Sequence, residues 1–220
     1  MDTKDIDGDA MTRYLTLRRT QVKLNTELIR RLPRSMIVDS AKRLGLWQED
    51  SRIGGNDSEM AALTDFCLYD CSVDGGNVIT HYQAGAGFAS GSDEAVVIGA
   101  MAQSPSLSLF RIERTRKAQG VVLRDLLTGE ELFVVDQALG QTGWAGAFLA
   151  TRVLHVGAAG LNMTSGAALG VREAMAEGVT ADVHAEIGEG AAGVVAAMSR
   201  VERARLAVRL LREAFRDAWE

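Results

Sequence analysis

Two cysteines and one histidine come closest to a metal-binding pattern in this sequence. Cys67 and Cys71 are four residues apart on a segment expected to be helical, and His81 follows ten residues later. Sulfurs one helical turn apart can face the same side, but zinc would still need a ligand such as Asp70 or Asp74. Structural zinc sites usually combine two pairs of Cys or His ligands, and this chain has one pair. We therefore expect no bound metal.

A glycine-rich stretch matches the spacing of a dinucleotide-binding loop. Residues 188–193 read Gly-x-Gly-x-x-Gly and follow an alternating apolar run over residues 179–187. No second strand of a βαβ unit follows in the sequence, and Glu186 and Glu189 would repel a pyrophosphate. The sequence also contains neither a lysine-bearing phosphate loop nor a Gly-x-Ser-x-Gly elbow. We expect no cofactor and assign no catalytic residue, and leave open whether the protein is an enzyme.

Charge is unevenly distributed along the chain. Residues 10–48 carry nine basic and two acidic side chains, whereas residues 49–110 carry nine acidic and one basic. The two segments either neutralise each other or leave a basic patch that contacts phosphates. The net charge of −5 favours neutralisation. The nucleic-acid alternative would use Arg13, Arg18, Arg19, Lys23, Arg30 and Arg31.

A second nucleic-acid pattern lies within the same basic segment. Residues 39–46 are similar to the first helix and turn of a helix-turn-helix, in which an alanine packs between helices and a glycine makes the turn. The next helix would turn Glu49 and Asp50 toward phosphates and would stop at Gly54. We therefore do not expect this motif to bind DNA.

The composition is that of a globular protein. Apolar residues make up 47% and charged residues 24%, and no apolar run is long enough to span a membrane. The first nine residues are acidic and lack the apolar core of a secretory signal. Two cysteines without such a signal indicate a reducing cytoplasm. We expect a cytoplasmic protein without membrane contact.

Helix signals dominate the first half of the chain. Apolar residues three and four apart predict a helix over residues 11–32, and Pro33 suits the first turn of a second helix that Gly45 ends. Asn56 and Glu59, three residues apart, predict the capping box of a third helix. Two shorter helices are expected before residue 104.

The pattern then changes to that of strands. We expect a strand with a bulge after residue 107, a hairpin of residues 121–127 and 131–136, a long strand over 148–156 and a short strand over 161–165. About five strands with short connections are typical of a small barrel. The predicted core side chains are Leu123, Leu126, Val134 and Leu149.

A glycine- and alanine-rich stretch precedes the last apolar pattern. From residue 166 its composition predicts a linker. From Val194 to Ala218 apolar residues step by three and four, which predicts one long amphipathic helix with a heptad seam. The bulky pair Phe215 and Trp219 ends it. We expect this helix to mediate self-association or to bind a protein partner.

These patterns predict an α+β protein with four parts. They are an N-terminal helical region (residues 10–104), a small SH3-like five-stranded β-barrel (105–166), a Gly/Ala-rich linker (167–193) and a C-terminal amphipathic helix (194–219).

Three stretches, residues 31–46, residues 59–70 and residues 121–131 with 149–153, together resemble a group of uncharacterised bacterial proteins. The resemblance covers residues 30–170, and its barrel part is similar to a module found in proteins with a C-terminal SEC-C metal motif. That motif needs a Cys/His cluster, whereas this chain has no cysteine after Cys71. The resemblance implies no activity and no catalytic residue.

The sequence as a whole favours a non-enzymatic cytosolic interaction or regulatory protein built on a small β-barrel. Absent catalytic motifs, the barrel and the heptad helix support this hypothesis. The alternative is a nucleic-acid-binding protein that uses the basic helices of residues 10–48.

Overall fold

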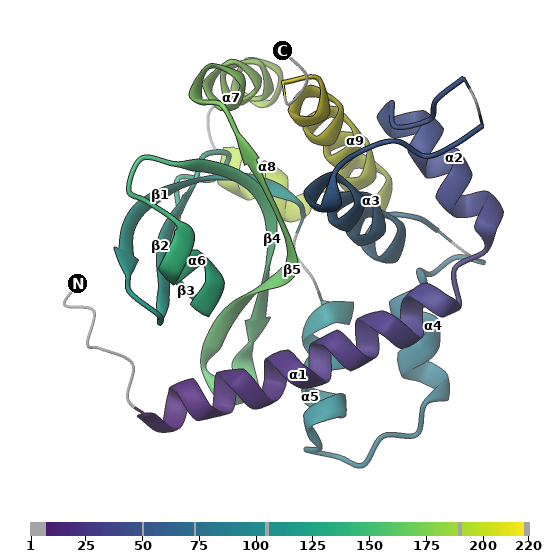
Figure 1. The fold of residues 1–220 in the computed structure, drawn as a ribbon, viewed down its shortest axis with the longest axis vertical. Helices are drawn as coiled ribbons and strands as arrows, with labels where there is room; N and C mark the ends of the chain where they lie inside the picture. Colours follow the sequence, from purple (N-terminus) through teal and green to yellow (C-terminus); the bar gives the residue numbers. More distant parts are fainter. Residues whose placement is uncertain (1–7, 50, 73, 104–105, 189–190, 218–220) are drawn as a thin grey trace.

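The computed structural model describes residues 8–49, 51–72, 74–103, 106–188 and 191–217 (Figure 1). In this part of the chain, nine α-helices surround one five-stranded antiparallel sheet, so the protein is a mixed α+β protein as predicted. None of the helices among these residues is both long and apolar enough to cross a membrane.

The helical first half follows the sequence signals. Pro33 precedes the second helix, and Gly45 ends it with φ of +83°. Asn56 and Glu59 form the predicted capping box, because Asn56 Oδ1 accepts from Glu59 N at 3.0 Å and Glu59 Oε2 accepts from Asn56 N at 2.7 Å. The helices are α1 (Gly8–Arg30), α2 (Arg34–Leu44), α3 (Asp57–Tyr69), α4 (Val78–Gly85) and α5 (Asp93–Ala102).

The strands form a sheet in the order β3-β2-β1-β4-β5, with every neighbouring pair antiparallel. The bulge expected in the first strand lies between Ile112 and Arg114. The fifth strand is longer than predicted and is joined to the fourth by the short 3-10 turn η1 (Gly157–Ala159). The strands are β1 (Ser108–Arg116), β2 (Gly120–Asp125), β3 (Glu131–Val135), β4 (Phe148–Val156) and β5 (Leu161–Val171).

The sheet curls around a core of its own. Helix α6 (Gln137–Thr142) lies at one end of the curl, where Leu139 packs against this inner core (Figure 1). The other face of the sheet belongs to a larger core shared with the helices. The buried inner residues are Phe110, Ile112, Val121, Leu123, Val134, Leu149 and Val153.

The sheet of the described residues is not closed into a barrel, which corrects the predicted SH3-like closure. Its edge strands β3 and β5 are linked by a side chain, because Asn162 Nδ2 donates to the carbonyl of Phe133 at 3.0 Å. Helix α1 covers the free edge of β5 instead, where Gln21 Nε2 donates to the carbonyl of Ser165 at 2.8 Å. An edge covered by a helix needs no further strand.

The described residues of the stretch predicted as a linker lie mostly in regular secondary structure. Residues 167–193 include the end of β5, helix α7 (Glu173–Ile187) and the first residues of α8 (Ala191–Ala197). Val179 and Val183 belong to an apparent period-two pattern, but they are also four residues apart and are buried on one face of α7. Packing of this face against the core therefore favours a helix over a strand for this segment.

The predicted continuous C-terminal helix is two helices, α8 and α9 (Arg200–Asp217). Ser199 begins α9, because its hydroxyl oxygen accepts from Glu202 N at 3.3 Å and Glu202 Oε2 accepts from Ser199 N at 2.8 Å. This capping arrangement interrupts the seam. Ala218 and Trp219 lie outside the described residues. Of the predicted seam, Leu211 and Phe215 are buried in the protein's own core, whereas Val201 is 59% exposed. The buried face of α9 consists of Leu206, Ala207, Leu210, Leu211, Ala214 and Phe215.

Truncating the inner core should destabilise the protein. Leu123 is fully buried inside the curl, whereas Leu126, also predicted as core, is half-buried in the hairpin turn. We expect Leu123→Ala to lower the free energy of unfolding by about 2–5 kcal/mol, because it removes buried methyl groups and leaves a cavity. Leu126→Ala should cost clearly less. Urea unfolding of both variants measures this, and equal losses would contradict the assignment of the inner core.

Candidate functional site

A bulge in β5 lies opposite Arg152 on β4. Thr151 pairs with Ala168 and Val153 pairs with Thr164, so the three residues 165–167 face Arg152 alone. Gly166 has a φ of +105°, a conformation that favours glycine. Bulges bend a strand and redirect side chains next to functional sites.

Arg152 carries a buried positive charge into the core between the sheet and α3. Its side chain is 2% exposed, and Nε donates to Asp65 Oδ2 at 3.1 Å while Nη2 donates to Asp70 Oδ2 at 2.6 Å. The guanidinium lies 4.6 Å from the ring centroid of Tyr69. Burial raises the pKa of Asp70, and the charge of Arg152 opposes that rise. The ion pairs tie β4 to the end of α3.

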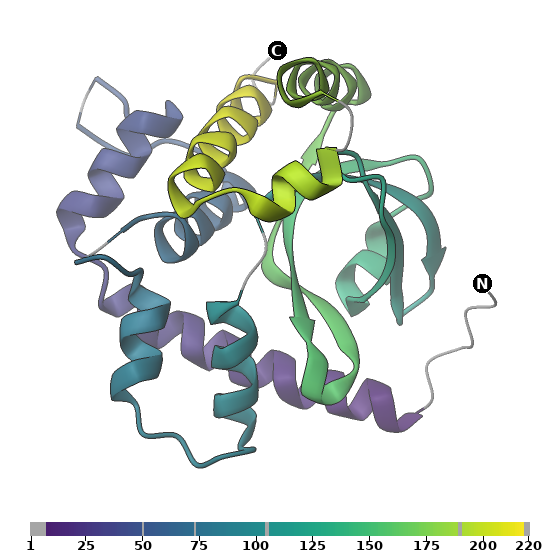
Figure 2. The same ribbon diagram turned by 180° about the vertical axis from the view of Figure 1, so that it is seen from behind.

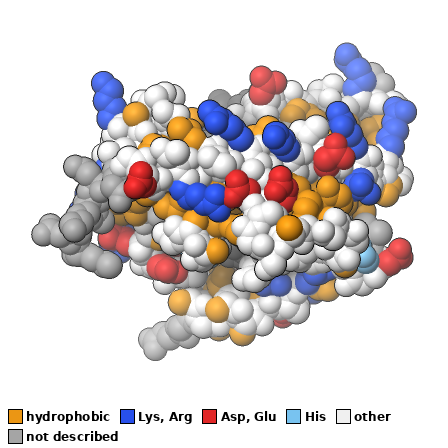
Figure 3. Space-filling view, turned by 90° about the horizontal axis from the view of Figure 1, so that it is seen from below, with side chains coloured by type: hydrophobic (Ala, Val, Ile, Leu, Met, Phe, Trp, Pro, Cys, Tyr) orange, Lys and Arg blue, Asp and Glu red, His pale blue; other side chains and the backbone are white. Residues whose placement is uncertain are grey.

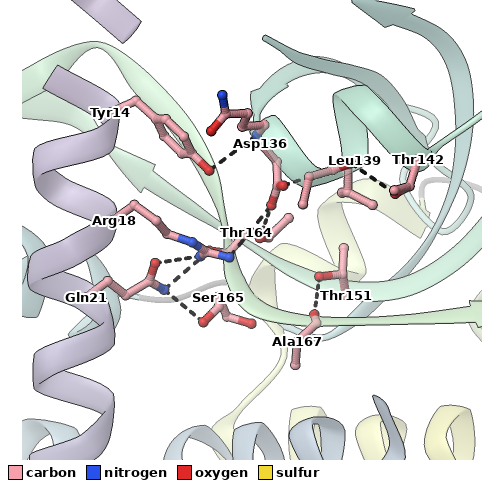
Figure 4. A network of polar contacts seen from close by, with 12 residues as sticks. Tyr14, Arg18, Gln21, Asp136, Leu139, Thr142, Thr151, Thr164, Ser165 and Ala167 are labelled. Atoms are coloured by element: carbon pink, nitrogen blue, oxygen red, sulfur yellow. Dashed lines mark hydrogen bonds and ion pairs between the residues drawn. The ribbon is translucent and has the colours of Figure 1, made fainter. Parts of the chain in front are cut away.

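Helix α1 holds the outer side of the same bulge (Figure 4). Arg18 Nη1 donates to the carbonyl of Thr164 at 2.9 Å, next to the bond from Gln21 to Ser165. The Thr164 hydroxyl donates to Asp136 Oδ2 at 2.7 Å, and Asp136 Oδ1 accepts from the first turn of α6. One polar network thus fixes α1, the bulge and the helix at the end of the curl.

The other end of the curl contains a cavity of about 340 Å³. Its floor includes Phe110, Leu132 and Val153, which belong to or pack on the inner core. Helix α8 contributes Ala192, Val195 and Ala196 to its lining. In the view from behind, this helix crosses that end of the curled sheet (Figure 2). The polar lining residues are Gln103, Ser106, Ser108, Asp125, Thr128, Glu130, His155 and Arg203.

The hairpin turn supplies a half-buried carboxylate to this lining. Asp125 Oδ1 accepts from the Ser108 hydroxyl at 2.8 Å and from the backbone N–H groups of Leu127 and Thr128 at 2.8 and 3.1 Å. Burial raises the pKa of the Asp125 carboxyl, and these bonds oppose the rise. The carboxylate therefore holds the turn and the cavity wall together.

The remaining polar groups come from other elements. His155 Nδ1 lies 2.7 Å from Asn162 Oδ1, and Arg203 reaches the cavity from the first turn of α9. The Ser108 hydroxyl donates to a carboxylate and is not bonded to a histidine, so these groups do not form a serine–histidine relay. An apolar floor with convergent donors and acceptors is suited to bind a small molecule.

Helix α8, which lies over this cavity, is short and loosely packed. It has seven residues, of which Val195 lines the cavity and is half-buried while Val194 is 40% exposed. Few buried contacts hold a segment of this kind, and such segments open at low cost. Binding inside the cavity would therefore change how firmly α8 is held.

The basic residues of the nucleic-acid alternative do not share one surface. Arg13 pairs with Asp93, as expected if the two charged segments neutralise each other, and Arg18 points toward the β5 bulge. Arg30 binds Glu27 on its own helix at 2.9 Å. On the face seen in Figure 3, basic side chains are interspersed with acidic and apolar ones.

Three further basic candidates lie at the surface. Arg31 stacks 4.8 Å from the ring centroid of Tyr82, and Arg19 and Lys23 are exposed on α1. The segment after Gly45 is not the second helix of a helix-turn-helix, because its described residues form a bridge between Trp47 and Ile53. Nucleic-acid binding remains an untested prediction.

The cysteine pair is buried at the end of α3. Cys71 Sγ lies 3.3 Å from the Ser40 hydroxyl, and its hydrogen bond with Cys67 lowers the pKa of Cys71 to about 7 while raising that of Cys67. Among the residues described, no three His, Cys, Asp or Glu side chains are grouped as metal ligands. The absence of zinc remains a prediction.

The glycine fingerprint follows a helix where a dinucleotide fold needs a strand. Its preceding run is α7, and Gly188 caps that helix with φ of +72°. Residues 189–190 lie outside the described part of the chain. The cavity under α8 was also not predicted from the sequence. The hairpin turn at Asp125 was predicted from neighbouring residues, whereas His155 and Arg203 come together at this cavity only through tertiary structure.

Comparisons with known proteins give one match. A family model described as a family of unknown function, DUF7986, covers residues 8–183. Neither a curated protein nor a solved structure matches the chain.

Removing Arg152 should be far more costly than removing an exposed arginine. Arg152→Ala leaves Asp65 and Asp70 buried without their cation, and we expect a loss of about 3–5 kcal/mol in the free energy of unfolding. Arg124→Ala, which breaks exposed pairs with Glu113 and Glu131, should cost about 0–1 kcal/mol. Chemical denaturation measures both values. Similar losses would show that Arg152 does not anchor the core.

Asp125 should make stability depend on pH with a defined sign. Its raised pKa means that the folded protein holds the proton more tightly than the unfolded chain, so this contribution is complete below about pH 4 and is lost as pH rises through the folded-state pKa. Asp125→Asn keeps an acceptor oxygen and removes the titration. The unfolding free energy of the variant minus that of the wild type should therefore rise between about pH 4 and 7.

Glu113 provides the control of opposite sign. Hydrogen bonds from Arg111 and Arg124 lower its pKa, so its contribution is present at neutral pH and lost as the pH falls. For Glu113→Gln the same difference should fall, slightly, as the pH rises. Urea unfolding across this range measures both variants, and a flat profile for Asp125→Asn would contradict the assignment.

Proposed function

Because the chain belongs to the family of unknown function DUF7986, we propose its function from the geometry: it is a non-enzymatic regulatory protein that binds a small molecule under α8. The observation that carries the proposal is the cavity inside the curled sheet. Its volume of about 340 Å³ lies within the range of small-molecule sites.

The chemistry of the cavity supports binding rather than catalysis. The Asp125 carboxylate is occupied by the hairpin turn and by Ser108, and His155 is occupied by Asn162. Proton transfer needs a base in reach of a nucleophile or of a substrate proton. Here the carboxylate is bonded to Ser108, and the imidazole is bonded to Asn162. The expected ligand has an apolar body over Phe110 and polar groups at its rim.

The cover supports a regulatory role. A ligand that contacts Val195 from below stabilises the closed position of α8, and a ligand can shift an equilibrium only through such differential contacts. Helix α8 leads directly into α9, so its position is linked to the helical core. We propose that a protein partner binds differently to the protein when α8 is closed and when it is open. We also propose a location in the reducing cytoplasm, with which two free cysteines are consistent.

Two tryptophan variants on the same helix test the proposal. Val195→Trp fills the cavity from its cover, whereas Val194→Trp changes the exposed face of α8 by the same volume. The probe is the apolar dye anilinonaphthalene sulfonate, measured by fluorescence titration. We expect Val195→Trp to weaken dye binding by at least about tenfold, because the indole ring occupies the space that the dye would fill. Val194→Trp should leave the dye affinity unchanged.

A second measurement separates binding from turnover. Metabolites that raise the melting temperature of the wild type, but not of Val195→Trp, are recovered after incubation and identified by mass spectrometry. Unchanged molecules support a binding protein. Equal dye affinity in the two tryptophan variants would overturn the cavity as the site, and chemically altered molecules would overturn the non-enzymatic assignment.

A further inference from the structure

A second, smaller cavity lies beside the buried Arg152 ion pairs. It has a volume of about 40 Å³ and a predominantly polar lining. It is separate from the cavity under α8, although Arg203 borders both. Its lining residues are Tyr69, Asp70, Asn77, Ala102, Arg152, Arg200 and Arg203.

The charges around this small cavity do not balance. Arg152, Arg200 and Arg203 bring three guanidinium groups to its wall. The nearby carboxylates are Asp65 and Asp70, and both are bonded to Arg152. Among these five side chains the guanidinium groups outnumber the carboxylates by one, and the half-buried Arg200 and Arg203 are partly withdrawn from water.

One guanidinium nitrogen in the cluster has no acceptor. Nη1 of Arg200 is buried and has no hydrogen-bond partner within the described part of the chain. Charged donors left without an acceptor in the interior cost more than neutral ones. An anion in the cavity would supply both the acceptor and a negative charge.

The position of the arginines on α9 adds to this potential. Arg200 and Arg203 lie in the first turn of an 18-residue helix, whose N-terminal end is positive. Glu202 of the same turn binds the backbone N–H of Ser199 and is exposed. It is not among the residues that line the cavity.

We propose that this cavity binds a small monovalent anion between Arg200 and Arg203. One negative charge neutralises the excess of the cluster and accepts the unused N–H of Arg200. The volume is enough for about three water molecules, so the anion has one to four heavy atoms, as in chloride, nitrate or the carboxylate of a short acid. The site shares Arg203 with the cavity under α8 but does not require a ligand there.

The test compares sodium salts on the full chain at constant ionic strength. Chloride, nitrate and formate are each exchanged against gluconate, which is too large for the cavity, while the melting temperature is recorded. We expect a saturable rise with the small anions. Comparing the half-saturating concentrations of chloride and nitrate with that of formate shows whether the cavity prefers an inorganic ion or a carboxylate.

Matched variants assign the effect to the cavity. Arg200→Gln and Arg203→Gln should raise the half-saturating anion concentration at least tenfold. Arg212→Gln, the same charge change at an exposed position of α9, should leave it unchanged. A response that is unsaturable, or equal in all three variants, would overturn the proposal because it reflects a general salt effect.

Bromide locates the ion directly if a variant fails to fold. Crystals of the wild type soaked in bromide should show an anomalous peak between Arg200 and Arg203. A cavity that contains only water under these conditions would overturn the site. Failure here leaves the dye experiment on α8 unaffected, because that experiment uses different residues.

Discussion

The buried charge of Arg152 is the constraint on which the rest of the structure depends. A guanidinium that is 2% exposed persists only if acceptors replace its water, and Asp65 and Asp70 supply them. This requirement sets where α3 ends relative to β4. It also accounts for the bulge, because three residues of β5 pass opposite Arg152 of β4, whose side chain points toward α3.

The open sheet follows from how the bulged edge is satisfied. Side chains of α1 bond the carbonyls of Thr164 and Ser165, so β5 needs no partner strand and the curl does not close. An unclosed curl must be covered at its ends. Helix α6 packs tightly at one end, whereas α8 covers the other and leaves a cavity. The candidate ligand site is thus a consequence of the same edge chemistry.

The two cavities illustrate different uses of buried polarity. Asp125 is bonded to Ser108 and to the N–H groups of its own turn, which makes a rigid wall against which a ligand can be oriented. Around Arg200 the polarity is unbalanced, with a free donor and an excess charge. Rigid, satisfied polarity suits recognition, and unsatisfied charge draws in a counter-ion.

Local features of the chain were determined by the sequence alone. The capping box of Asn56 and Glu59 and the limits of β4 (Phe148–Val156) depend on residues close along the chain, and both were predicted. Only the tertiary structure decided the partners of Arg152, which lie 82 and 87 residues away, and the order of the glycine-rich stretch. Local signals act over a few residues through backbone geometry, whereas a buried charge finds its partners only when distant segments pack together.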